Sequence, residues 1–162
     1  MRLVTISLQT SQSVICQCGS GRTAEPEFMT PSQNIVLVVD GDLAVRESLK
    51  FALQIEGLAV FVFANGAELL AHPVLRMARC IILDHKMPLM DGFDILAHLA
   101  AGKVTAPVIL MTAHATESLC RRAATAGVRH VLEKPLLDGA LVDRIHDILA
   151  GRLSPADVVN PI

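Results

Sequence analysis

Short runs of β-branched and other apolar residues recur along the chain from residue 34 onward, and amphipathic segments separate them. Five of these runs are apolar enough to be buried on both faces: residues 35–39, 59–63, 80–83, 108–111 and 130–132. Buried strands that alternate with helices are typical of a parallel sheet, because parallel strands need a long crossover connection. The pattern therefore predicts repeated strand–helix units.

The segments between the runs carry apolar residues at helical spacing. The clearest repeats are Val45, Leu49 and Leu53, then Leu96 and Leu99, then Leu141, Ile145, Ile148 and Leu149. Gly57 and Gly127 stand where glycines end helices, and a short helix is expected near residues 67–72. No long linker or internal repeat divides residues 34–150. We predict an α/β fold, a doubly wound five-stranded parallel sheet flanked by helices in a flavodoxin-like (βα)5 order.

The two ends of the chain differ from this pattern. Residues 1–33 are rich in Ser, Thr, Gln and Gly and show no clear helical or strand period after Ile15. We interpret them as a flexible extension, either natural or partly a cloning remnant ahead of a native start at Met29. The folded domain is then expected over residues 34–152, with a tail at 153–162.

Composition narrows the class of protein. The chain has 162 residues, 52% of them hydrophobic and 19% charged, which suffices for a core. A net charge of -2, with no basic cluster longer than Arg121-Arg122, argues against binding to nucleic acid or an anionic membrane. No apolar run is long enough to span a bilayer, and the first 18 residues make a poor signal peptide. A cytoplasmic protein is expected.

The four cysteines do not suggest a cross-linked or zinc-binding protein. They are Cys16, Cys18, Cys80 and Cys120. Their spacing matches neither a disulfide framework nor paired Cys-x-x-Cys units, so we interpret all four as reduced thiols.

Polar residues follow the predicted strands where each strand ends. Asp40 and Asp42 follow the first, Asp84 the third, Thr112 the fourth and Lys134 the fifth. In open parallel sheets ligands bind beyond these carboxyl ends. Neighbouring carboxylates would repel one another unless a cation shared the site, and Mg²⁺ suits a site with few carboxylates, water and phosphate oxygens. Taken singly, each residue has an ordinary alternative as a helix cap or solvated loop residue.

This arrangement favours chemistry at phosphorus. A carboxylate at a strand end can act as the nucleophile, while a metal ion, Thr112 and Lys134 balance charge on the transferred oxygens.

Three stretches of the sequence resemble the motifs of one protein family, and they occur in that family's order and spacing. They are Ile81-Ile82-Leu83-Asp84-His85-Lys86-Met87-Pro88-Leu89-Met90-Asp91-Gly92, Leu110-Met111-Thr112-Ala113 and Leu132-Glu133-Lys134-Pro135. With them, residues 34 to about 150 resemble the receiver domain of bacterial two-component response regulators. The resemblance implies a phosphoacceptor at Asp84, which a histidine kinase or phosphotransfer protein would load in a Mg²⁺-dependent reaction.

The same resemblance assigns roles around Asp84. Thr112 would hydrogen-bond the acyl phosphate and Lys134 would pair with it, while Asp40 and the backbone carbonyl of Lys86 would help Asp84 to hold Mg²⁺. It also implies a cis peptide bond between Lys134 and Pro135.

Two departures from the family pattern stand out. Gly41 takes the place of the second acidic residue after the first strand, so Asp42 is the candidate substitute as a metal ligand. Val131 takes the place of the aromatic switch residue, and a short β-branched side chain cannot swing between buried and exposed rotamers as a ring can. Any readout would then run through Thr112 and the following loop, or through His130.

The leading hypothesis is a signalling protein without an output module that contacts a downstream protein target, as a monomer or weak homodimer. It is not expected to be an enzyme beyond self-dephosphorylation, which His85 and His114 could influence. Two alternatives stay open. One is a haloacid-dehalogenase-like phosphatase with Asp40 as nucleophile. The other is a degenerate receiver that signals without phosphate, which is suggested by the departures from the family pattern at Gly41 and Val131.

Overall fold

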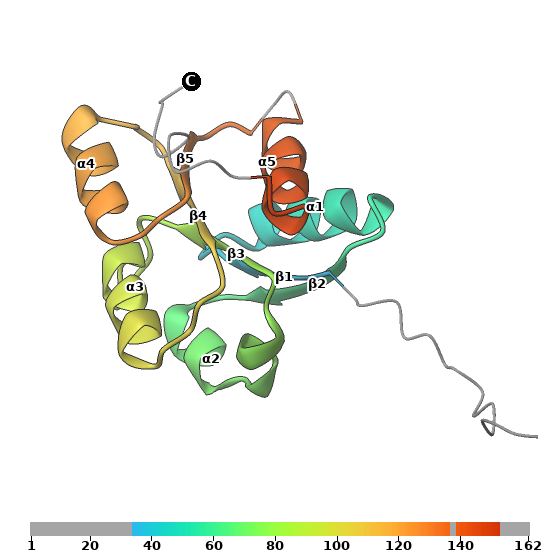
Figure 1. The fold of residues 1–162 in the computed structure, drawn as a ribbon, viewed down its shortest axis with the longest axis horizontal. Coiled ribbons are helices and arrows are strands. Elements are labelled where there is room, and N and C mark those ends of the chain that lie inside the picture. Colours follow the sequence, from blue (N-terminus) through green and yellow to red (C-terminus); the bar gives the residue numbers. More distant parts are fainter. Residues whose placement is uncertain (1–33, 137–138, 153–162) are drawn as a thin grey trace, which may run out of the picture. The chain divides into compact units, whose positions relative to one another are not determined.

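The computed structural model describes residues 34–136 and 139–152 and gives them an alternating strand and helix order (Figure 1). The strands are β1 (Ile35–Val39), β2 (Ala59–Phe63), β3 (Cys80–Asp84), β4 (Val108–Thr112) and β5 (His130–Glu133). The helices are α1 (Leu43–Ile55), α2 (Gly66–Ala71), α3 (Gly92–Ala101), α4 (Glu117–Thr125) and α5 (Ala140–Leu149), with a 3-10 helix, η1 (Pro73–Met77), after α2.

The strands form one parallel sheet in the order β2-β1-β3-β4-β5. Strand order reverses between β1 and β3, because the chain first adds β2 on one side of β1 and then β3 on the other. The register places Val39 beside Leu83, so the residues that follow them meet at one edge of the sheet. A doubly wound sheet binds ligands in the crevice at this reversal.

Helices cover both faces of the sheet (Figure 1). Because successive side chains of a strand point to opposite faces, Val36 and Val38 pack with residues of α1 and α5, while Leu37 and Val39 pack with residues of α2, α3 and α4. The strands are therefore held between two apolar layers, which fixes the positions of their carboxyl ends.

Polar caps begin the helices at the same edge. Asp42 caps α1, and Asp91 caps α3 in a reciprocal capping box with Asp94. At the opposite ends of α1 and α4, Gly57 and Gly127 adopt φ of 77° and 80°, a region in which a side chain would be strained. The prediction of terminal glycines at positions 57 and 127 is confirmed.

The predicted fold class is confirmed, with differences in detail. Three strands extend one residue further than predicted, to Asp84, Thr112 and Glu133. The prediction that every strand is covered on both faces is wrong for β2, where Phe61 is 40% exposed because β2 is an edge strand. Helix η1 was not predicted, although a proline at its start suits a helical first turn.

Several predictions fall outside the described residues, namely those for residues 1–33 and 153–162, with Cys16 and Cys18 among them. Cys80 and Cys120 are free, buried thiols, and burial raises the pKa of Cys80 to about 12. Among residues 34–136 and 139–152, no helix has the length and apolar character to cross a membrane.

Candidate functional site

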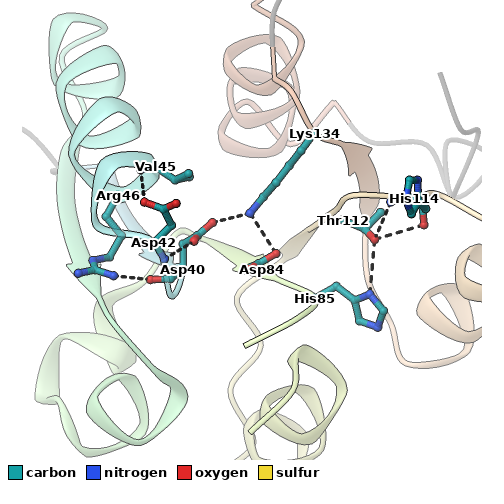
Figure 2. Close-up of polar contacts among 9 residues, drawn as sticks. All are labelled: Asp40, Asp42, Val45, Arg46, Asp84, His85, Thr112, His114 and Lys134. Carbon is teal, nitrogen blue, oxygen red and sulfur yellow. Dashed lines mark hydrogen bonds and ion pairs between the residues drawn. The ribbon is translucent and has the colours of Figure 1, made fainter. Parts of the chain in front are cut away.

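An ammonium group bridges two buried carboxylates at the carboxyl edge of the sheet (Figure 2). Lys134 Nζ lies 2.7 Å from Asp40 Oδ2 and 3.1 Å from Asp84 Oδ1. Asp40 is 1% exposed and Asp84 is 9% exposed. We call these three residues the carboxylate cluster.

Strand order brings the cluster together. Asp40 directly follows β1 and Asp84 ends β3, and these strands are neighbours in register. Lys134 directly follows β5, two strands away from β3, so its long side chain must reach across the edge of β4. The peptide bond between Lys134 and Pro135 is cis, as the resemblance implied.

Further hydrogen bonds fix Asp40 in place. Its Oδ1 accepts from the backbone N–H of Asp42 at 2.8 Å, and its carbonyl oxygen accepts from Arg46 Nη1 at 2.7 Å. Sequence reasoning did not identify Arg46. The only signal for it is a basic residue in the first turn of the helix that follows the acidic strand end.

Opposing effects set the protonation of the cluster. Burial raises the pKa of Asp84, and the neighbouring Asp40 adds to this, whereas the hydrogen bond and positive charge of Lys134 oppose it. Burial alone would lower the pKa of Lys134, but its bonds to Asp40 and Asp84 outweigh that effect and the pKa is raised. Lys134 is therefore a firmly charged partner for both carboxylates.

A hydroxyl group lies on the β4 side of the same edge (Figure 2). Thr112 Oγ1 donates to the carbonyl oxygen of His114 at 3.2 Å and accepts from the His114 backbone N–H at 3.3 Å. Its third contact is His85 Nδ1, at 3.4 Å. Burial lowers the pKa of His85. We call Thr112, His85 and His114 the hydroxyl cluster.

The structure separates Asp42 from the other two acidic residues. Asp42 Oδ1 accepts from the backbone N–H groups of Ala44 and Val45 at 2.8 and 3.4 Å, so this carboxylate caps α1. The Lys86 side chain is exposed. Within the described ranges, no group of three or more His, Cys, Asp or Glu side chains is arranged to hold a metal ion.

Position 41 has room for a side chain. A Cβ atom added to Gly41 would lie 3.5 Å from Pro88 Cδ and 4.0 Å from Met87 Cγ, which are ordinary contact distances. The backbone there does not require glycine, because Gly41 has no positive φ. Its lack of a carboxylate is therefore not enforced by the fold.

A hollow of about 660 Å³ lies near the opposite end of the strands, where its lining includes His72, Arg76 and Lys103 and no residue of either cluster. This hollow is therefore separate from the carboxylate and hydroxyl clusters.

Most of the described chain matches a known protein family. Residues 36–146 match the family described as the response regulator receiver domain. The chain belongs to this family. The receiver match gives no support to the haloacid-dehalogenase-like alternative.

Named relatives and solved structures agree with this receiver assignment. The chain is 38% identical over 112 residues to the transcriptional regulatory protein FixJ of Azorhizobium caulinodans, covering 69% of this chain and 53% of that protein. It is 36% identical to the C4-dicarboxylate transport transcriptional regulatory protein DctR of Rhodobacter capsulatus, covering 75% and 64%. The receiver thus spans about half to two thirds of the length of these relatives.

Two solved structures share the receiver fold. The chemotaxis protein CheY4 of Vibrio cholerae matches with a TM-score of 0.68 and 25% identity over 72% of this chain and 99% of that one. The structure described as FixJ-N matches with a TM-score of 0.64 and 27% identity over 75% and 97%.

Proposed function

We propose that Asp84 accepts a phosphoryl group from a histidine kinase or phosphotransfer protein, and that the receiver, over residues 34–152, signals this state by protein contact. The observation that carries the proposal is the position of Asp84. It ends the central strand β3 at the reversal of strand order, beside a second carboxylate and under a bridging ammonium. The receiver family supplies the reaction class, phosphoacceptor signalling.

The reaction balances with the groups present. A carboxylate oxygen of Asp84 attacks phosphorus and forms a C–O–P bond, while the P–N bond of a donor phosphohistidine breaks. The imidazole nitrogen leaves with the electron pair and takes a proton from solvent. Lys134, freed from part of its pairing with Asp84, then balances charge on the phosphoryl oxygens.

The residues present fit Mg²⁺ bound by few protein ligands. Asp40 and Asp84 place two carboxylates side by side at the edge, and Mg²⁺ binds through one or two carboxylates with several retained waters. Asp40, Asp84 and the Lys86 carbonyl would hold the ion, with Asp42 as a further ligand only if it leaves its cap. When bound, Mg²⁺ supplies positive charge for the transferred oxygens.

The surroundings favour a protein as donor. Leu43, at the start of α1, is 62% exposed, and Leu89, in the loop after β3, is fully exposed. Leu89 also has φ of 73°, a strained conformation for a residue with a side chain. Large apolar side chains exposed on the segments that follow β1 and β3 suit the docking of another protein.

Asp40 is the weaker candidate for the nucleophile. It is 1% exposed, and both of its carboxylate oxygens accept hydrogen bonds, one from Lys134 and one from the Asp42 backbone. A nucleophile at this position would have to give up these partners and reach solvent.

Labelling with acetyl phosphate and Mg²⁺ tests the proposal. Wild type is expected to incorporate phosphate, and Asp84→Asn to fall to background because an amide cannot form the acyl phosphate. The matched control is Asp91→Asn, which alters a capping carboxylate seven residues away that makes no contact with Lys134. Labelling that persists in Asp84→Asn would contradict the assignment.

A further inference from the structure

The ring of Phe93 on α3 lies between a site residue and an exposed cation. The His85 ring stands edge-on to it, with centroids 5.5 Å apart and an interplanar angle of 84°. On α4, Arg122 Cζ lies 3.8 Å from the centroid of the same ring. Phe93 is buried and Arg122 is exposed. We call His85, Phe93 and Arg122 the ring stack.

The backbone under the ring stack is fixed. The His85 N–H donates to the Met111 carbonyl at 2.7 Å, and the His85 carbonyl accepts from the Gly92 N–H at 2.9 Å. A Cβ atom at Gly92 would come within 2.9 Å of the Asp84 carbonyl oxygen, so α3 begins in tight contact with the β3 end. Because the His85 backbone is held in place, a change in the position of the His85 side chain would displace the Phe93 ring that it contacts.

The Thr112 hydroxyl connects the ring stack to the phosphoryl site. A hydroxyl has one proton, and Thr112 donates it to the His114 carbonyl. Donation to a phosphoryl oxygen on Asp84 requires that bond to break and the hydroxyl to turn. The contact of Thr112 with His85 Nδ1, already 3.4 Å long, changes with it.

Val131 on β5 does not offer a second route from the phosphoryl site to α4. Val131 is 3% exposed and packs in the apolar layer that includes Phe93, Cys120 and Ala123. A β-branched side chain in such a layer has one strongly preferred rotamer and no room to swing.

We propose that phosphoryl occupancy of Asp84 is transmitted through His85 and Phe93 to Arg122, which changes where this positive charge sits on the exposed face of α4. This inference rests on the proposed function. His85 and Phe93 act as positioning residues, because neither is assigned to bind the phosphoryl group. The surface that responds is that of α4 around Arg122, which a downstream protein would contact.

The test compares two neighbouring arginines of α4. Arg122 stacks on Phe93, whereas Arg121 pairs with Glu117 on the solvent side, with its side chain 73% exposed. Amide spectra are recorded for wild type, Arg122→Gln and Arg121→Gln, each with and without beryllium fluoride and Mg²⁺. We expect Arg122→Gln to reduce the shift changes in α4 at least about twofold while leaving those at residues 84–88 unchanged. Arg121→Gln should behave as wild type.

A second variant keeps the ring and removes the hydrogen bond. His85→Phe retains an aromatic edge against Phe93 but loses Nδ1 as a partner of Thr112. It should bind the mimic, shown by shift changes at residues 84–88, yet give reduced changes at Arg122. Shift changes in α4 that are equal in wild type, Arg122→Gln and His85→Phe would overturn the ring stack while leaving phosphoacceptance intact. Absence of any change at residues 84–88 in wild type would instead count against the proposed function.

Discussion

The two clusters at the carboxyl edge of the sheet are held by different kinds of bond. In the carboxylate cluster, full charges meet at 2.7 and 3.1 Å, and Asp40 is almost wholly buried. In the hydroxyl cluster, the three contacts of Thr112 are longer, at 3.2 to 3.4 Å, and two of them are to backbone groups of His114. Charge-assisted bonds are shorter and about twice as strong as neutral ones.

The difference indicates a division of labour. The carboxylate cluster is fixed before any donor arrives, because Lys134 binds both carboxylates and its removal would leave them without their shared cation. The hydroxyl cluster can exchange partners at small cost, because each of its bonds is weak and its groups are not held by full charges. We therefore propose that the carboxylate cluster carries out phosphoryl transfer and that the hydroxyl cluster transmits the phosphorylated state.

The largest expected effect comes from breaking the carboxylate cluster. Lys134→Met removes the cation and leaves Asp40 and Asp84 to repel each other. We expect a loss of about 2 kcal/mol in the free energy of unfolding, below the ~3–5 kcal/mol of a fully buried pair because the Lys134 side chain is 26% exposed. Urea unfolding at neutral pH measures it.

The control for this variant is Lys86→Met, in which an exposed lysine of the same edge is replaced. It should lie within about 0.5 kcal/mol of wild type. Equal losses of unfolding free energy in Lys134→Met and Lys86→Met would show that Lys134 contributes no more to stability than an exposed lysine.

A substitution in the apolar core at β5 should change stability without changing how phosphorylation is transmitted to α4. Val131→Ala removes buried methyl groups and should cost about 2 kcal/mol in the free energy of unfolding. The shift changes in α4 caused by beryllium fluoride should stay as in wild type, because Val131 lies outside the ring stack. If those shift changes vanish, β5 takes part in transmitting the phosphorylated state, and transmission is not confined to the hydroxyl cluster and the ring stack.

Adding a carboxylate should strengthen the first cluster. Gly41→Asp fits, since a Cβ atom there makes only ordinary contacts with Pro88 and Met87. We expect Mg²⁺ affinity to rise about tenfold, or ~1.4 kcal/mol, measured by calorimetry on the unphosphorylated protein. Gly41→Ala adds the Cβ atom alone and should not change affinity. Unchanged affinity in Gly41→Asp would indicate that Asp42 already serves as the ligand.

The smallest effect concerns the pH dependence of stability. Because burial raises the folded-state pKa of Asp84 above 3.8, the unfolded chain loses this proton first as pH rises. Stability is therefore lost between pH 3.8 and the raised pKa, and Asp84→Asn avoids the loss. The variant should match wild type in acid and exceed it by no more than about 1 kcal/mol at neutral pH, since Lys134 offsets much of the burial cost. If Asp84→Asn were less stable than wild type at pH 7, ionised Asp84 would stabilise the fold, and its folded-state pKa would be lowered instead of raised.

The sequence was sufficient to place the main site residues. Parallel strands end at one edge, so the apolar runs before Asp84, Thr112 and Lys134 predicted that these residues share an edge of the sheet. The structure puts all three there, and it pairs Lys134 with both Asp40 and Asp84. Their chemical roles remain proposals.

Other features depended on three-dimensional detail. Asp42 could be a ligand or a cap in the sequence, and only the turn of the chain into α1 directs its carboxylate to the Ala44 N–H. The exposure of Phe61 follows from strand order, which local pattern does not reveal. The ring stack joins residues from the end of β3, from α3 and from α4, so no short spacing signals it.

Chemical trapping identifies the residue that accepts the phosphoryl group. The protein is loaded with acetyl phosphate and Mg²⁺ and then reduced with borohydride, which converts an aspartyl phosphate to homoserine, and the position is found by peptide mass spectrometry. We predict homoserine at position 84 alone, with Asp40 and Asp42 unchanged. Homoserine at position 40 would contradict the account, because the nucleophile would then be the carboxylate that we describe as buried and fully paired.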